Sequence, residues 1–291
     1  MKYQKILITI HVALLMFACQ KEEQWHALLD KDLSGWETFL GIPDSSVQNL
    51  NLERNPEGKY TDVLGVNMDP KSVFTTDIEN GETVLRISGE IFGGISTLQE
   101  FENYHLKMKV KWGEKKWPPR DQQKRDSGVL YHCTGEHGVT WGFWMRSQEF
   151  QVQEGDFGDY WSLAESRIDI PSVINQSDSA FVYNAEAPLR SYGYELDNGL
   201  HCKKSDNFEK PNGEWNTIEI ICVGDRSLHI VNGSVVMALS NSRFADGNTD
   251  TPLTKGKLQI QSEGAEVFYK DIRIKNLPAM PDKYETFFRY N

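Results

Sequence analysis

The chain has 291 residues, of which 39% are hydrophobic and 25% are charged, and its formal net charge is -11. This length is enough to bury the core of one large β domain or of two small ones. A nucleic-acid partner needs a basic surface, and the sequence contains no run rich in lysine and arginine. The composition therefore excludes nucleic-acid binding.

The N-terminus has the form of an export signal. Two lysines lie in residues 1–5, and the apolar run over residues 6–17 is too short to span a bilayer as a mature helix. The residues ending at Cys19 resemble a bacterial lipobox, and residues 20–23 resemble the short acidic tag of surface lipoproteins of the Bacteroidetes type. We expect residues 1–19 to be a lipoprotein signal segment that ends at the lipidated Cys19. The protein would then be lipid-anchored to a membrane outside the cytoplasm, at the outer membrane or cell surface or otherwise in the periplasm; the alternative is a plain cleaved signal.

Regular strand patterns follow along the chain. No apolar period of 3.6 holds for three turns, and Asn232-Gly233 is a strong hairpin signal. Residues 41–69 read as a long surface excursion with one short strand, and residues 161–214 as long loops with one or two short strands that form a lid or wall of a cleft. Many short strands indicate an all-β sandwich of jelly-roll type. The predicted strands are residues 84–87, 91–97, 104–112, 215–223, 228–231, 235–239, 256–262 and 267–275.

Polar chemistry is concentrated in residues 125–160. Residues 127–134 alternate as a half-buried strand does, so Tyr131 and His132 are expected on opposite faces. Residues 149–154 form a second such strand. Its core side carries Phe150 and Val152, and its other face carries Glu149, Gln151 and Gln153.

This second face has the composition of a sugar-binding site. A carboxylate and two amides supply hydrogen bonds to hydroxyl groups, and the nearby Trp141 and Trp144 supply apolar stacking surface. The alternative is an ordinary solvated sheet face, but such a face has no need of two tryptophans. Carbohydrate is the first substrate class.

The cysteines other than Cys19 are odd in number: Cys133, Cys202 and Cys222. In an oxidising compartment at least one of them stays free or pairs with another chain. Spacing does not choose a pair, and no CxxC or HxxH arrangement supports a zinc site. We expect a disulfide or buried thiols.

Short motifs in a fixed order cover nearly the whole mature chain. They are WHALLD (25–30), LSGW (33–36), DSGV (126–129), EFQV (149–152), GDY (158–160), EWNT (214–217), HIVNG (229–233), GKLQIQ (256–261) and FYKDI (268–272).

Together these motifs resemble the DUF1080 family, also called the 3-keto-disaccharide hydrolase domain, over about residues 25–277. The resemblance implies a concanavalin A-like jelly roll that acts on oxidised glycosides. We expect one such domain over residues 20–291, with a long insertion at about 161–214 as its departure from the family. The resemblance by itself identifies no catalytic residue.

Nine residues of the central stretch have no evident structural role and are expected to line the cleft. In the enzyme hypothesis, a keto group at sugar C3 acidifies the C2 proton, a base removes it, and an acid protonates the C1 leaving group before water adds. Glu149 is the candidate base and His132 or Asp156 the candidate acid. The expected substrate-binding residues are Arg125, Asp126, Trp144, Gln151, Glu154 and Asp159.

Three alternatives stay open. A direct two-carboxylate glycosidase would use Glu149 and Glu154. No spacing requires a cofactor, although a divalent cation held by carboxylates would polarise the keto oxygen. In the third alternative, the protein is a non-catalytic carbohydrate-binding module at the cell surface. A partly buried Glu149 with a raised pKa would favour catalysis, and an open groove of coplanar tryptophans would favour binding.

Overall fold

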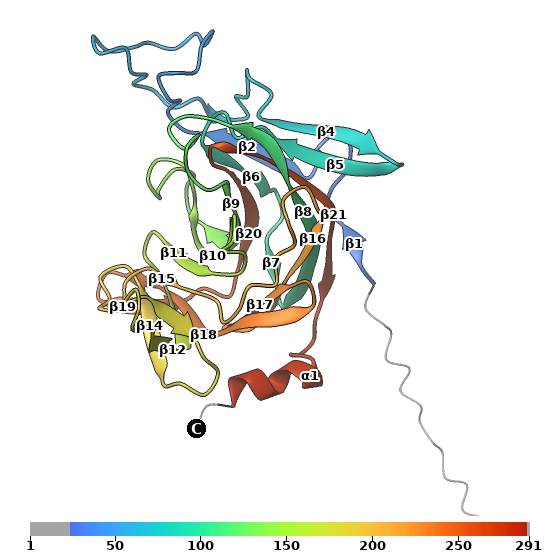
Figure 1. Ribbon diagram of the computed structural model, residues 1–291, viewed down its shortest axis with the longest axis vertical. Helices are drawn as coiled ribbons and strands as arrows, with labels where there is room; N and C mark the ends of the chain where they lie inside the picture. Colours follow the sequence, from blue (N-terminus) through green and yellow to red (C-terminus); the bar gives the residue numbers. More distant parts are fainter. Residues whose placement is uncertain (1–23, 290–291) are drawn as a thin grey trace, which may run out of the picture.

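Two large antiparallel sheets pack face to face in the computed structural model, which describes residues 24–289 (Figure 1). The expected all-β jelly-roll sandwich is confirmed. The predicted lipidation site, Cys19, lies outside the described residues. Within residues 24–289, no helix is long and apolar enough to cross a membrane.

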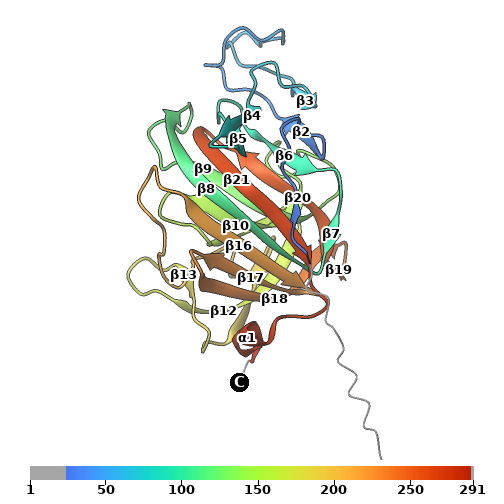
Figure 2. The same ribbon diagram turned by 90° about the vertical axis from the view of Figure 1, so that its right-hand side faces the viewer.

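The larger sheet has the strand order β13-β12-β18-β17-β16-β8-β21-β5-β4, with β1, β14 and β19 paired at its margins (Figure 2). Its strands are β1 (His26–Ala27), β4 (Phe74–Glu79), β5 (Glu82–Ile87), β8 (Tyr104–Lys116), β12 (Ser166–Ile174), β13 (Phe181–Tyr183), β14 (Leu189–Gly193), β16 (Asn216–Val223), β17 (Arg226–Val231), β18 (Ser234–Asp246), β19 (Thr249–Pro252) and β21 (Ala265–Asn276).

The smaller sheet has the order β15-β11-β10-β9-β20-β6-β2-β3, with β7 paired to β20. Its strands are β2 (Trp36–Leu40), β3 (Gly65–Val66), β6 (Gly93–Thr97), β7 (Phe101–Glu102), β9 (Asp126–Thr134), β10 (Arg146–Gln153), β11 (Tyr160–Leu163), β15 (His201–Cys202) and β20 (Lys255–Ser262). The chain ends in a short helix, α1 (Asp282–Glu285), and a 3-10 turn, η1 (Thr286–Phe288).

The main core lies between the two sheets and fixes the faces of the central strands. Phe150 and Val152 of β10 are fully buried in it, together with Val129 of β9 and Leu106 of β8. This burial confirms the predicted core side of β10. The opposite side of β10 therefore points away from the larger sheet.

A β-bulge in β9 changes the predicted alternation after Tyr131. At this place two residues of β9 stand opposite one residue of β10 and one residue of β20, and His132 has a left-handed φ of 55°. An extra residue in one strand shifts the following side chains to the other face. Tyr131 and His132 consequently contact each other in the interior, so their predicted placement on opposite faces is wrong.

The segment 161–214 is more regular than the sequence suggested. It contributes β11, β12, β13, β14 and β15 where one or two strands were expected. β12 pairs with β18 at the side of the larger sheet, and β14 pairs with β12. Local patterns underestimate such strands because they are short and gain their stability from the neighbour on which they pair.

Two smaller expectations are met. The excursion over residues 41–69 contains only the short strand β3 and projects beyond the sheets at the top of Figure 1. Cys133, Cys202 and Cys222 are free and buried. The buried-thiol alternative is therefore the one that the structure shows for these three residues.

Candidate active site

Three neighbouring strands of the smaller sheet, β10, β9 and β20, carry the candidate site on the face that points away from the larger sheet. Gln151 stands opposite Gly128, and Gln153 stands opposite Asp126. On its other side, β9 pairs with β20, and Gln259 stands opposite Leu130. Two residues further along this antiparallel pair, β20 lies beside Gly128. Residues far apart in the sequence are thus aligned in rows across the sheet.

A cavity of about 200 Å³ lies over these rows. All three polar side chains of the outer face of β10 line it, which confirms their predicted common face. Its lining residues are Arg120, Asp126, Trp141, Trp144, Glu149, Gln151, Gln153, Trp161, Gln261 and Glu263.

The tryptophans form walls and not a flat platform. Trp144 is buried, and its indole N–H donates to the carbonyl oxygen of Gly93 at 3.0 Å. Trp141 is 59% exposed and meets Trp144 edge to face, with 85° between the ring planes. Trp161 lines the cavity from β11. These rings offer apolar surface around the polar floor.

Gly128 leaves the room in which the polar side chains meet. A Cβ atom at this position would overlap Oε1 of Glu149 and Oε1 of Gln261. Only a residue without a side chain lets the two groups approach over the middle strand. The carboxyl group of Glu149 therefore lies above β9, although its backbone belongs to β10.

We expect Gly128→Ala to lower activity by about 100-fold, because a displacement of reacting groups by about 1 Å has that cost. The backbone φ of Gly128 suits alanine, and the overlapping atoms belong to side chains, so the protein should still fold. Gly35→Ala is the matched control, since a Cβ there meets no atom within 4 Å. Steady-state rates of both variants, with circular dichroism, test this; equal rates would contradict the role of Gly128.

Three carboxyl groups share the cavity and have raised pKa values. Burial raises the pKa of Asp126 to about 7, against the opposing effect of the Arg120 guanidinium and a 2.5 Å hydrogen bond from Gln153. Burial raises the pKa of Glu149 well above its usual range, and the charge of Asp126 adds to this. Burial and Asp126 likewise raise the pKa of Glu263. Arg120 and Gln153 thus favour the ionised form of Asp126, and the charge of Asp126 disfavours ionisation of Glu149 and Glu263.

Arg120 provides the positive charge of the site. It pairs with Asp126 and with Glu263, the latter at 3.2 Å. Among the described residues, Arg120 Nε, Asp126 Oδ1 and Gln261 Oε1 are buried without a hydrogen-bond partner. Buried polar atoms are normally paired, so three unpaired atoms around one cavity indicate a place for a polar ligand.

Four of the residues predicted from the sequence line the cavity: Glu149, Asp126, Trp144 and Gln151. The other five lie elsewhere. Arg125 pairs with Glu154 at 3.3 Å, and Asp156 pairs with Lys124 at 2.6 Å.

Asp159 and His132 also lie outside the cavity lining. Asp159 accepts hydrogen bonds from the backbone N–H of Lys204 at 2.9 Å and from His201 at 3.0 Å, and His201 stacks on Trp161. Asp159 thus supports the wall of the cavity from behind. Burial lowers the pKa of His132 to about 4, which keeps its ring neutral inside the core.

Six lining residues were not among the predicted site residues: Arg120, Trp141, Gln153, Trp161, Gln261 and Glu263. The sequence from Leu258 to Gln261 alternates apolar and polar residues, and this pattern was a usable signal for Gln261; the same period of two, continued past Ser262, reaches Glu263. Gln153 shares the face of Glu149 by the same rule. Arg120 lies in a loop, where no periodicity exists to locate it.

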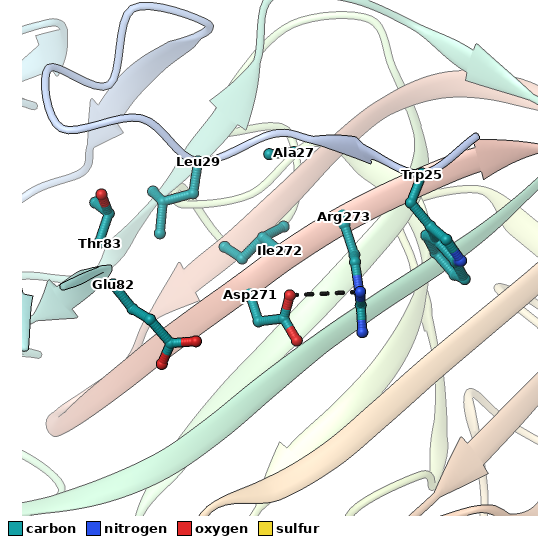
Figure 3. A pocket seen from close by; sticks show the side chains of 8 residues that line it. All are labelled: Trp25, Ala27, Leu29, Glu82, Thr83, Asp271, Ile272 and Arg273. Atoms are coloured by element: carbon teal, nitrogen blue, oxygen red, sulfur yellow. Dashed lines mark ion pairs between the residues drawn. The ribbon is translucent and has the colours of Figure 1, made fainter. Parts of the chain in front are cut away.

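A second hollow, on the outside of the larger sheet, has less chemistry (Figure 3). Its acidic residues are engaged: Asp271 pairs with Arg273 at 3.3 Å, and Glu82 pairs with Lys270. The hydrogen bond from Lys270 lowers the pKa of Glu82, in the direction opposite to the shift at Glu149. Within residues 24–289, no group of three His, Cys, Asp or Glu side chains is arranged to hold a metal ion.

Residues 24–275 match the model of a protein family described as the 3-keto-alpha-glucoside-1,2-lyase-like domain. Among curated proteins, none matches the sequence. Two solved structures from Parabacteroides distasonis, both named as candidate glycosyl hydrolases, are similar to this chain. The first is 19% identical, and the match covers 87% of this chain and 94% of its own, with a TM-score of 0.46. The second is 18% identical, and the match covers 87% of this chain and 100% of its own, with a TM-score of 0.46. The carbohydrate-binding module CBM66 from Bacillus subtilis is 9% identical over 70% of this chain and 92% of its own, with a TM-score of 0.39.

Proposed function

Because the chain belongs to the family of 3-keto-alpha-glucoside-1,2-lyase-like domains, we propose that it cleaves a 3-keto-glycoside in the cavity of Asp126, Glu149 and Glu263. The observation that carries the proposal is the set of three carboxyl groups in one cavity whose pKa values are raised by burial. Enzymes assign acid and base roles by this means.

The reaction needs a proton acceptor for sugar C2. Asp126 is the carboxyl group whose ionised form is bound by both Arg120 and Gln153. Near pH 7 it exists as a carboxylate in part of the molecules. We assign it the removal of the C2 proton, in place of the base role expected for Glu149 from the sequence.

The leaving group needs a proton donor. Glu149 keeps its proton at neutral pH, because burial and the neighbouring Asp126 raise its pKa. Its proton passes to the oxygen on C1 as the C1–O bond breaks and a C1–C2 double bond forms. Water adds across that double bond later and yields the free 3-keto sugar. The negative charge that develops on the keto oxygen would be stabilised by Arg120, whose Nε has no partner among the described residues.

Two observations favour catalysis over a binding module. Glu149 is only 4% exposed and has a raised pKa, and Trp141 and Trp144 stand nearly perpendicular. A module that binds a sugar chain would present coplanar rings on an open groove. A glycosidase that uses Glu149 with Glu154 is disfavoured, because Glu154 pairs with Arg125 outside the cavity.

The test compares a 3-keto-α-glucoside with its unoxidised parent, each with and without a chelator. We expect cleavage of the keto compound alone, because only the keto group acidifies the C2 proton. The chelator arm decides whether a divalent cation takes part. Cleavage of neither compound would overturn the proposal in favour of sugar binding, and equal cleavage of both would indicate a direct glycosidase.

We also propose that Cys19 carries a lipid that holds this enzyme on a membrane outside the cytoplasm. The support is the sequence of residues 1–23, in which a short apolar run is followed by a lipobox-like end and an acidic tag. Mass spectrometry of the mature N-terminus tests this: a diacylated Cys19 is expected, and any other N-terminal residue would contradict it.

A further inference from the structure

An apolar hollow of about 380 Å³ lies near the candidate active site. We call it the apolar hollow; its carbon surfaces come from Ile42, Pro43, Phe92, Pro119 and Phe143. Ile42 is 43% exposed, so one wall is open to solvent. Its volume falls in the range of small-molecule sites, which are mostly apolar concavities of about 300–1,000 Å³.

The polar groups at its edge are already engaged. Asp44 accepts a hydrogen bond from the backbone N–H of Ser46 at 2.8 Å, and Glu90 pairs with Lys71 at 3.3 Å. A ligand in the apolar hollow therefore meets mainly carbon. A second sugar ring would leave most of its hydroxyl groups without partners there, and that has a high cost in free energy.

The apolar hollow adjoins the catalytic cavity at two places. Pro119 and Phe143 line the hollow, while the residues that follow them in the chain, Arg120 and Trp144, line the cavity. The rings of Phe143 and Trp144 have centroids 5.6 Å apart. The linings of the hollow and of the cavity are thus in contact through these two rings.

Gly264 lies beside Arg120, at the Pro119–Arg120 contact between the two spaces. A Cβ atom there would lie 2.9 Å from Cβ of Arg120 and 3.4 Å from Cε1 of Phe92. Arg120 lines the cavity and Phe92 lines the hollow, so Gly264 lies close to one lining residue of each space.

We propose that the apolar hollow binds the leaving group of the glycoside, and that this group is an aromatic or otherwise apolar aglycone. The inference rests on the proposed function, because it assigns the sugar ring to the carboxyl cavity. In this arrangement the C1–O bond lies at the junction, between the proton donor Glu149 and the hollow. The aglycone would contribute binding energy through contact with Phe92 and Phe143, and the keto sugar would supply the reacting atoms.

The experiment measures KM and kcat for phenyl and methyl 3-keto-α-glucosides with the parent protein and with Ile42→Ser. We expect the parent to have at least about a tenfold lower KM for the phenyl compound. Ile42→Ser should remove most of that preference by raising KM for the phenyl compound. Val63→Ser is the matched control, because Val63 is 46% exposed in the same excursion but does not line the hollow.

Calorimetric binding of the unoxidised phenyl and methyl α-glucosides separates the two proposals. If no keto-glycoside is cleaved but the phenyl preference exists and is lost in Ile42→Ser, the proposed function fails and the apolar hollow stands as an aglycone site. If keto-glycosides are cleaved without a phenyl preference, or if Ile42→Ser leaves that preference intact, the inference is overturned. Preference for a glucosyl over a phenyl leaving group would likewise overturn it and make the hollow a sugar subsite.

Discussion

Asp126→Asn lowers the turnover of a 3-keto-glycoside by about 10²–10⁴-fold, the usual contribution of a general base. Asparagine has nearly the same shape as aspartate and can still accept a hydrogen bond from Arg120, but it cannot accept the C2 proton. In the parent, kcat/KM should rise as pH increases through about 7, where Asp126 loses its proton. This limb of the pH profile should be absent in the variant.

Stability supplies the control for this variant. The pKa of Asp126 is near the ordinary 3.8 in the unfolded chain and is raised to about 7 by burial in the folded protein. The folded protein therefore holds a proton that the unfolded chain releases, so the parent loses stability as pH rises between these values. Asp126→Asn lacks this loss and should unfold at the same or a higher temperature than the parent at pH 8. Parent-like turnover in the variant would remove Asp126 as the base.

Glu149→Gln should reduce cleavage of a substrate with an alcohol leaving group by about 10²–10⁴-fold, because glutamine cannot donate the required proton. A p-nitrophenolate leaving group needs little such help, since p-nitrophenol is a far stronger acid than an aliphatic alcohol. We expect the variant to cleave p-nitrophenyl 3-keto-α-glucoside at a rate within about tenfold of the parent. The measurement is the ratio between the rate loss for the substrate with an alcohol leaving group and the rate loss for the p-nitrophenyl substrate.

This ratio separates an acid from a base. Loss of a base would slow both substrates equally, because each must lose its C2 proton. An equal loss would therefore return Glu149 to the base role expected from the sequence. Folding is not at issue, since the protonated Glu149 and glutamine have similar volume and the fully buried Phe150 anchors the strand in the core.

Local sequence patterns determined much of the fold. The period of two in β10 places Phe150 and Val152 in the core and the side chain of Glu149 on the other face. The Asn232-Gly233 turn has the positive φ angles that a tight hairpin requires, 49° and 87°. Such features follow from neighbours along the chain, so one sequence is enough to predict them.

The roles of the site residues depended on contacts between distant segments. Glu263 and Gln261 join Glu149 only because β20 pairs with β9, and Arg120 joins them from a loop. The β9 bulge turns His132 into the core, which no periodic pattern predicts.

Proton affinity is the clearest case of a property that the sequence did not contain. Glu149 occupies the predicted position, yet its raised pKa follows from burial in the folded protein and from the charge of Asp126. Desolvation and charge–charge interaction depend on distances in space, and these are fixed only when the strands have paired and the loops have closed over them. The sequence by itself determined which residues share a face; the tertiary structure decided which of them hold a proton.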